Sequence, residues 1–267
     1  MYRNGLKVIG ISIGAVLLTT LAIDASDALS GKGGSLLAQL AGIEQSLCED
    51  GMVHVPAALT FSCVDEYEAT PSEACPVSEP ASQLDTDANL GHPTCAVTSE
   101  PDLLPWRHVT REQAAVLCTR AGKRLPTAEE WYRSALGTDA AVCNVSSGEV
   151  KNGEDFLECR SAAGIVNTVG NVWEWVADDV IDGIYQGRKL PATGYIAQVD
   201  AGGMATMTTG DEKDEMLGGY FWSKEDGAYG VIRGGFYGSK TDAAPYTVHA
   251  YTAPTFRGAA VGFRCVK

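Results

Sequence analysis

The chain has 267 residues, 45% of them hydrophobic, and its 34 acidic and 20 basic residues give a formal net charge of −14. This length and apolar content suffice for one sizeable core, so the composition indicates a globular protein with one main domain. It argues against nucleic-acid binding, because a phosphate backbone requires a basic protein face.

The N-terminal segment predicts export. An uncharged apolar run over residues 8–23 follows Arg3 and Lys7. The run is longer than most signal-peptide cores and just short of the ~20 residues that span a bilayer. We expect residues 1–28 to be either a cleaved signal peptide or a retained signal anchor in a membrane. Residues 29–47 predict a tether to a domain over residues 48–267.

Eight cysteines agree with export, since they form an even set without a CxxC pair that would favour zinc or redox chemistry. Disulfides are therefore expected. Eight cysteines allow 105 pairings, and the spacing alone does not choose among them. The cysteines are Cys48, Cys63, Cys75, Cys95, Cys118, Cys143, Cys159 and Cys265.

Apolar and polar residues alternate within residues 51–56 and 59–69, a pattern that predicts short strands. Residues 69–95 form a proline-rich polar stretch that predicts a loop, with Cys75 and Cys95 near its ends. Two helices follow, because Thr110 to Gln113 and Thr127 to Glu130 have the spacing of capping boxes. The remainder is rich in glycine and predicts strands within residues 166–178, 229–238 and 259–267, with residues 201–219 as a polar surface insertion.

Glu174 lies between Trp173 and Trp175 in the sequence GNVWEW. In a strand, both rings would face inward and the acid would face the opposite side. Burial of an unpaired carboxylate costs several kcal/mol. Glu174 is therefore expected to face solvent, to pair with a cation or to bind a metal ion.

Four motifs occur in order: GKRLPTAEEW at 122–131, GNVWEW at 170–175, RGG at 233–235 and GFRC at 262–265. Together they resemble the formylglycine-generating enzyme (sulfatase-modifying factor) family, from about Gly51 to the C-terminus. Several motifs in register are more specific than one. The resemblance implies an α+β fold of the C-type-lectin-like kind, with two short helices, short irregular strands and disulfides.

The resemblance also implies the disulfide pairing. A long-range bridge would join the first helix to the last strand, which here corresponds to Cys118 and Cys265. The remaining pairs would then be Cys143 with Cys159, Cys48 with Cys63, and Cys75 with Cys95.

A calcium site is implied in the same way, because the family pattern N-x-x-G-N-x-W-E matches residues 167–174. Hard oxygen ligands suit Ca²⁺. The implied ligands are the side chains of Asn167 and Glu174 and the carbonyls of Gly170 and Val172. A second site at Asn144, Val145 and Asp155 departs from the family spacing. The alternative for Glu174 is an ion pair with Arg233 or Arg264.

The family's oxidative activity uses two copper-binding cysteines after RGG. Thiolates are needed because soft sulfur favours Cu(I). Here Ser239 and Ala244 stand near those positions, and no cysteine lies between Arg233 and Cys265. No copper is expected. Two function classes follow: a ligand-binding protein, which we favour, and an enzyme of the family with altered, non-copper oxidative chemistry.

The segment between RGG and GFRC mixes rigid aromatic and small polar residues, as binding loops do. It resembles the segment that diversity-generating retroelements rewrite in some lectin-like proteins. We expect a recognition surface for an extracellular protein or a glycan, the alternative being a polar surface hairpin. The expected surface residues are Tyr237, Ser239, Asp242, Tyr246, His249, Tyr251 and Phe256.

Overall fold

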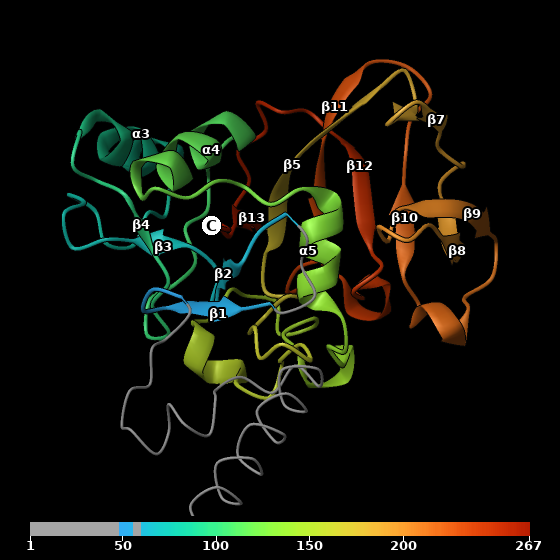
Figure 1. Ribbon diagram of the computed structural model, residues 1–267, viewed down its shortest axis with the longest axis horizontal. Helices are drawn as coiled ribbons and strands as arrows, with labels where there is room; N and C mark the ends of the chain where they lie inside the picture. Colours follow the sequence, from blue (N-terminus) through green and yellow to red (C-terminus); the bar gives the residue numbers. More distant parts are fainter. Residues whose placement is uncertain (1–47, 56–59) are drawn as a thin grey trace, which may run out of the picture. The chain divides into compact units, whose positions relative to one another are not determined.

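A curled sheet of nine strands forms the centre of the computed structural model (Figure 1), which describes residues 48–55 and 60–267. The strand order is β7-β6-β5-β11-β12-β10-β8-β9, and β13 pairs with β5 in parallel. The central strands are β5 (Trp173–Ile181), β11 (Ala228–Arg233), β12 (Val248–Thr252) and β13 (Val261–Phe263). The outer strands are β6 (Ile184–Tyr185), β7 (Arg188–Lys189), β8 (Gly194–Val199), β9 (Ala205–Thr209) and β10 (Tyr220–Trp222).

Two small antiparallel pairs accompany this sheet. β1 (Met52–His54) pairs with β2 (Cys63–Asp65), and β3 (Thr70–Pro71) pairs with β4 (Val97–Thr98). Residues 48–267 form one unit by their internal contacts. The predicted signal segment and tether lie outside the described residues. None of the helices in the described part is long and apolar enough to cross a membrane.

Both predicted capping boxes are confirmed. α4 (Arg111–Arg120) begins after Thr110, whose hydroxyl accepts from the backbone of Gln113. α5 (Ala128–Ala135) begins after Thr127 in the same way, with Glu130 as the returning side chain. Each box satisfies backbone N–H groups that the first helical turn leaves without partners.

A third helix, α3 (Gln83–Gly91), corrects the prediction of two helices and of a loop over residues 69–95. Ser82 caps it by accepting from the backbone N–H of Asp85. The helix buries the polar residues Thr86 and Asn89 and has no apolar stripe. The sequence therefore lacks the hydrophobic periodicity that predicts a helix. The prediction of a polar surface insertion over residues 201–219 is also partly wrong, because β9 lies within this stretch and pairs with β8.

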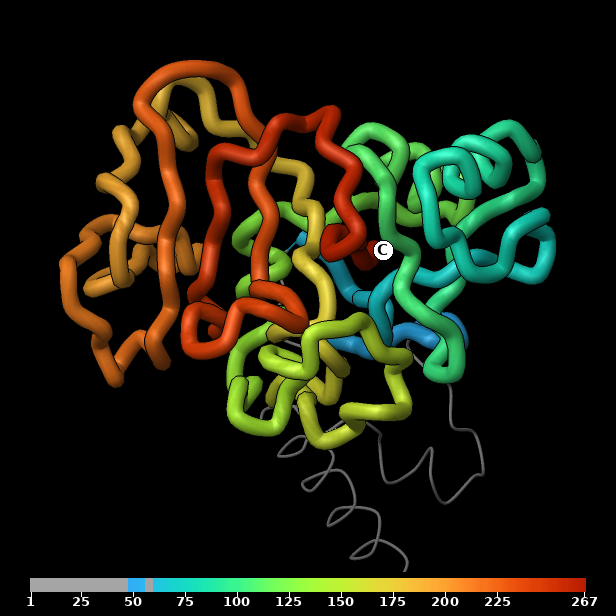
Figure 2. The backbone as a smooth tube through the Cα atoms, turned by 180° about the vertical axis from the view of Figure 1, so that it is seen from behind, coloured from blue at the N-terminus to red at the C-terminus, as the bar shows by residue number. Residues whose placement is uncertain are grey.

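Short 3-10 turns complete the described structure: η1 (Ala140–Val142), η2 (Gly153–Phe156), η3 (Asp214–Met216) and η4 (Lys240–Asp242). α4 and α5 both contact β5, and an apolar cluster lies beneath each of them. Figure 2 shows the chain from behind, with β11 between β5 and β12 and the last residues returning to the middle of the domain.

The four disulfides have the pairing that the family resemblance implies: Cys48–Cys63, Cys75–Cys95, Cys118–Cys265 and Cys143–Cys159. Cys118–Cys265 fastens α4 to the chain just after β13. On the chain-entropy model, a bridge closing so long a loop contributes about 4 to 5 kcal/mol. It therefore holds the C-terminal segment against the helical side of the domain.

Candidate ligand-binding pocket

Glu174 pairs with Arg264 inside the protein, so the ion-pair alternative describes its environment. Its side chain is only 1% exposed. Arg264 reaches its two carboxylate oxygens through Nη2 at 2.6 Å and Nε at 2.7 Å. The indole N–H of Trp131, on α5, donates to the same carboxylate at 2.6 Å. The parallel register places Gly262 opposite Glu174, which brings Arg264 to this position.

A second buried carboxyl, Glu68, lies beside this pair, and the sequence analysis missed it. Asn171 Nδ2 donates to both Glu68 oxygens at 3.1 and 2.8 Å. Burial first, and then the nearby negative charge of Glu174, raise the pKa of Glu68 to about 8. Glu68 therefore keeps its proton at neutral pH.

The two predicted calcium segments are in direct contact. Asn171 N donates to the Asn144 carbonyl at 2.7 Å, and a Cβ on Gly170 would lie 2.4 Å from that same oxygen. Only glycine fits this approach, and its φ of +77° also favours glycine. The loop that carries Asn167 is thereby fixed against the loop that carries Asn144.

These loops match a calcium site in part. The side-chain oxygens of Asn144 and Asn167 are buried without a hydrogen-bond partner, and such hard oxygens are suitable ligands. Glu174 is different, because Arg264 and Trp131 already use its acceptor sites. Asp155 is exposed on η2. Within the described residues, no three His, Cys, Asp or Glu side chains form a group that could hold a metal.

Four of the predicted recognition residues line one pocket of about 510 Å³: Tyr237, His249, Tyr251 and Phe256. This volume lies within the range of small-molecule sites. His249 and Tyr251 alternate along β12 with the buried Val248 and Ala250, so both point away from the core. The other lining residues are Trp173, Ile232, Phe236, Thr252, Ala253, Gly258, Ala259, Ala260 and Val261.

The wall around His249 is aromatic, with the Lys224 ammonium 4.9 Å from the centre of the Tyr251 ring. The centroid of the His249 ring lies 4.2 Å from that of Tyr251, 5.7 Å from that of Trp222 and 6.1 Å from that of Trp173. Burial lowers the pKa of His249 to about 4, so its imidazole is neutral at physiological pH. Packed rings of this kind offer rigid apolar contact area to a ligand.

The other three predicted residues do not line this pocket. Ser239 Oγ accepts from Phe236 N at 3.0 Å and so shapes the turn before η4. Asp242 lies on η4, where burial raises the pKa of its carboxyl. Tyr246 packs against Tyr132 at a centroid distance of 5.6 Å. Of the seven predicted residues only Phe256 is exposed, at 48%, and the others are half-buried.

Sequence reasoning missed Trp173, Phe236 and the backbone wall at 258–261. Trp173 was expected to be a core ring, and it is buried, but one part of it still reaches the pocket. The only signal in the sequence was the two-residue spacing of Trp173 and Trp175, which places both rings on one face of β5. That pattern does not say which neighbouring segment leaves the ring partly uncovered.

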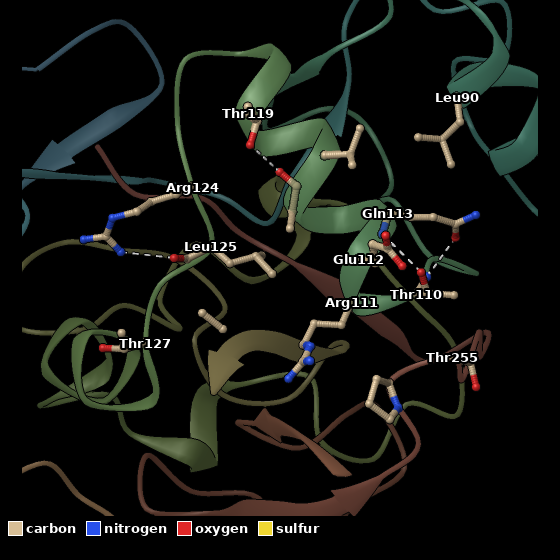
Figure 3. A pocket seen from close by; sticks show the side chains of 14 residues that line it. Leu90, Thr110, Arg111, Glu112, Gln113, Thr119, Arg124, Leu125, Thr127 and Thr255 are labelled. Atoms are coloured by element: carbon tan, nitrogen blue, oxygen red, sulfur yellow. Dashed lines mark hydrogen bonds between the residues drawn. The ribbon is translucent and has the colours of Figure 1, made fainter. Parts of the chain in front are cut away.

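A larger cavity of about 1000 Å³ lies between α4, the segment before α5 and the Pro254–Thr255 turn (Figure 3). Its cations already have partners in the protein. Arg111 pairs with Asp179 and donates to the Asp178 carbonyl at 2.8 Å, and Arg124 pairs with Glu130 at 2.7 Å. The aromatic pocket is therefore the better candidate for recognition.

The chain is similar in sequence to curated enzymes over part of its length. The chain is 32% identical over 120 residues to a formylglycine-generating enzyme from Bos taurus, covering 34% of this chain and 32% of the relative. It is 33% identical over 112 residues to the enzyme from Thermomonospora curvata, covering 32% and 37%. The chain thus matches about a third of the length of these curated relatives.

Solved structures with a similar fold include the I1 variant of the Major Tropism Determinant, with a TM-score of 0.48 and 18% identity. That match covers 83% of this chain and 53% of the other. Treponema denticola variable protein 1 matches with a TM-score of 0.43 and 16% identity, covering 82% and 91%. The sequence profile described as "Sulfatase-modifying factor enzyme 1-like domain" matches residues 62–267. The chain belongs to this sulfatase-modifying factor family.

Proposed function

We propose that this chain is an exported ligand-binding protein whose recognition site is the aromatic pocket lined by Tyr237, His249, Tyr251 and Phe256. The observation that carries the proposal is their convergence on one cavity of about 510 Å³. The four disulfides suggest an exported protein in an oxidising environment. Attachment to a membrane through residues 1–28 is part of the proposal.

The buried arginines of the scaffold and the aromatic side chains of the C-terminal segment are different residues, which suits diversification of that segment by a retroelement. Arg233 and Arg264, from the RGG and GFRC motifs, are fully buried and hold neighbouring segments together. The pocket side chains project from β12 and its flanking loops instead. Substitutions at Tyr251 or Phe256 would therefore change the ligand face while the buried arginines keep the fold.

The second candidate is an oxidative enzyme of the family with altered chemistry. Ser239 and Ala244 stand near the positions of the family's copper-binding cysteines. Ser239 accepts a backbone hydrogen bond and Ala244 is buried, and neither is a soft metal ligand. We favour ligand binding because the pocket has a concrete geometry, whereas no catalytic group has been identified for the alternative.

Truncation of the pocket should weaken ligand binding and leave the fold intact. We expect Phe256→Ala to reduce binding of ring-bearing fragments, in saturation-transfer NMR, by roughly 5- to 30-fold, the effect of losing about 1 to 2 kcal/mol. The melting temperature should change little, because exposed substitutions usually alter stability by less than about 0.5 kcal/mol.

Leu157→Ala is the matched control, since Leu157 is 44% exposed on another part of the surface. It should leave fragment binding unchanged. If both variants bind fragments as the wild type does, or if no ring-bearing fragment binds the wild type at millimolar concentration, the aromatic pocket is not the recognition site.

Calcium is the second element of the proposal, with Asn167, Gly170, Val172 and Glu174 as the implied ligands. The unpartnered Asn167 oxygen supports it, and the Glu174–Arg264 pair competes with it. At 100 times its dissociation constant, calcium would stabilise the fold by about 2.7 kcal/mol. The melting temperature of chelator-treated protein should then rise by roughly 5 to 11 °C.

Asn167→Ala should abolish this rise. The wild-type protein, melted with and without chelator, is the reference for it. If the wild-type melting curve is the same in both conditions, the Glu174 carboxylate binds only its protein partners and the calcium proposal is wrong.

A further inference from the structure

Residues 253–258, here called the lip, form one side of the aromatic pocket. Ala253, Phe256 and Gly258 line the pocket, while Pro254 and Thr255 of the same segment line the larger cavity. The Phe256 side chain is 48% exposed, so core packing does not fix its ring. The position of this ring therefore depends on the contacts that hold the backbone of the lip.

The backbone at the start of α4 and just before it holds the two ends of the lip. Arg111 N donates to the Pro254 carbonyl at 3.3 Å, and His108 N donates to the Gly258 carbonyl at 3.0 Å. These two bonds place the first and last parts of the lip. Its middle, which carries Phe256 and Arg257, is held by other contacts.

Arg257 fastens the middle of the lip to α3. Its guanidinium binds both oxygens of the Asp87 carboxylate, with Nη2 2.7 Å from Oδ1 and Nη1 3.2 Å from Oδ2. Nη2 also donates to the Gln83 carbonyl at 2.8 Å, and Nε donates to the His108 carbonyl at 3.2 Å. The Arg257 carbonyl accepts from Gln83 Nε2 at 3.2 Å. Arg257 thus joins three segments of the chain, and its side chain is only 16% exposed.

α3 is itself fixed to the core, so it can support the lip. Thr86, the residue before Asp87, is fully buried. Its hydroxyl accepts from the indole N–H of Trp106 at 3.1 Å and donates to the Arg107 carbonyl at 3.2 Å. The buried polar residue that hid α3 from sequence prediction therefore keeps Asp87 within reach of Arg257.

We propose that Arg257 is a positioning residue for the aromatic pocket, because its pairing with Asp87 holds the lip where the Phe256 ring contacts a bound ligand. This inference rests on the proposed function, since it assigns to the same pocket the contact that shapes one of its sides. An exposed ion pair contributes little to stability, but bidentate geometry fixes orientation. A lip that is ordered before binding spares the ligand the cost of ordering it, so the pair acts mainly on affinity.

The test uses Asp87→Asn, because Asp87 lies on α3 and does not line the pocket. Phenylacetamide, a neutral ring-bearing probe, is titrated into the full chain, with tryptophan fluorescence as the readout because Trp173 lines the pocket. We expect Asp87→Asn to weaken binding about three- to tenfold, the effect of ordering one or two side chains on binding. Its melting temperature should stay within a few degrees of the wild type. Asp87→Glu keeps the charge and should retain most of the affinity.

A second background distinguishes positioning from a general loss of structure. If Asp87 acts through the lip, Asp87→Asn should have no further effect in Phe256→Ala, because the ring that the lip positions is then absent. Glu129→Gln, which removes the Arg133–Glu129 pair on α5, is the matched control, since the Asp87 and Glu129 side chains are 49% and 48% exposed. It should leave probe binding unchanged.

The outcomes separate this inference from the proposed function. Equal probe affinities for Asp87→Asn and Glu129→Gln, or the same loss with and without the Phe256 ring, would overturn the positioning role of Arg257 while the pocket stands. Failure of phenylacetamide to bind the wild type at millimolar concentration would overturn the pocket itself, and the inference with it.

Discussion

Glu174→Gln is expected to lower the free energy of unfolding by about 3 to 5 kcal/mol, because it leaves the fully buried Arg264 guanidinium without a counter-charge. The amide keeps the shape of the carboxylate and can still accept a hydrogen bond from Trp131. Loss of the charge is therefore the main change. For a domain of this size the melting temperature should fall by roughly 6 to 20 °C.

Glu129→Gln is the control for this effect, since it breaks the exposed Arg133–Glu129 pair on α5. Exposed pairs contribute about 0 to 1 kcal/mol, so its melting temperature should stay within a few degrees of the wild type. Denaturant titrations of both variants give the free energies directly. A loss below about 1 kcal/mol for Glu174→Gln would show that the buried pair does not hold β13 against β5.

Glu68 is expected to make the fold less stable as the pH rises from about 4.5 to about 8. Its folded pKa of about 8 exceeds the ordinary value of 4.5, so in this window the folded protein keeps a proton that the unfolded chain has released. The contribution is complete below pH 4.5 and is lost as the pH passes through 8. Its slope is about 1.4 kcal/mol per pH unit, and the total reaches at most about 4 to 5 kcal/mol.

Glu68→Gln should remove this slope, because an amide does not titrate. Urea titrations at several pH values between 5 and 9 measure it, with the exposed Glu73→Gln as the control. As the pH rises, the free energy of unfolding should fall less steeply for Glu68→Gln than for the wild type and the control. Parallel curves for all three proteins would mean that Glu68 is ionised in the folded state.

The sequence predicted those parts of the fold that depend on local rules. Thr110 and Thr127 begin helices because a capping box needs only four consecutive residues. α3 escaped prediction because it buries Thr86 and Asn89, and polar residues give no hydrophobic period. The partner of Glu174 was left open between Arg233 and Arg264. The parallel register of β13 on β5 decides for Arg264, and that pairing joins segments about 90 residues apart.

The environment of Arg233 explains why the sequence alone could not identify the ion-pair partner of Glu174. Its guanidinium donates to the Ala128 and Gly203 carbonyls and lies over the Trp131 ring at 5.2 Å. Burial lowers its pKa to about 10. Carbonyl groups and an aromatic face are sufficient for this cation, so no carboxylate is required.

The candidate site was predictable to the extent that it follows one strand. His249 and Tyr251 are two residues apart on β12, and they share a face because side chains alternate between the two faces of a strand. Tyr246 precedes the strand and turns toward Tyr132 instead.

The most direct test of ligand recognition is an amide ¹H–¹⁵N NMR titration of the protein with a ring-bearing fragment such as phenylacetate. The largest chemical-shift changes should occur at Tyr237, His249 and Tyr251 and along residues 256–261, which surround the aromatic pocket. Changes concentrated on α4 and Arg124, around the larger cavity, would contradict the proposal, as would a spectrum that does not change at millimolar fragment.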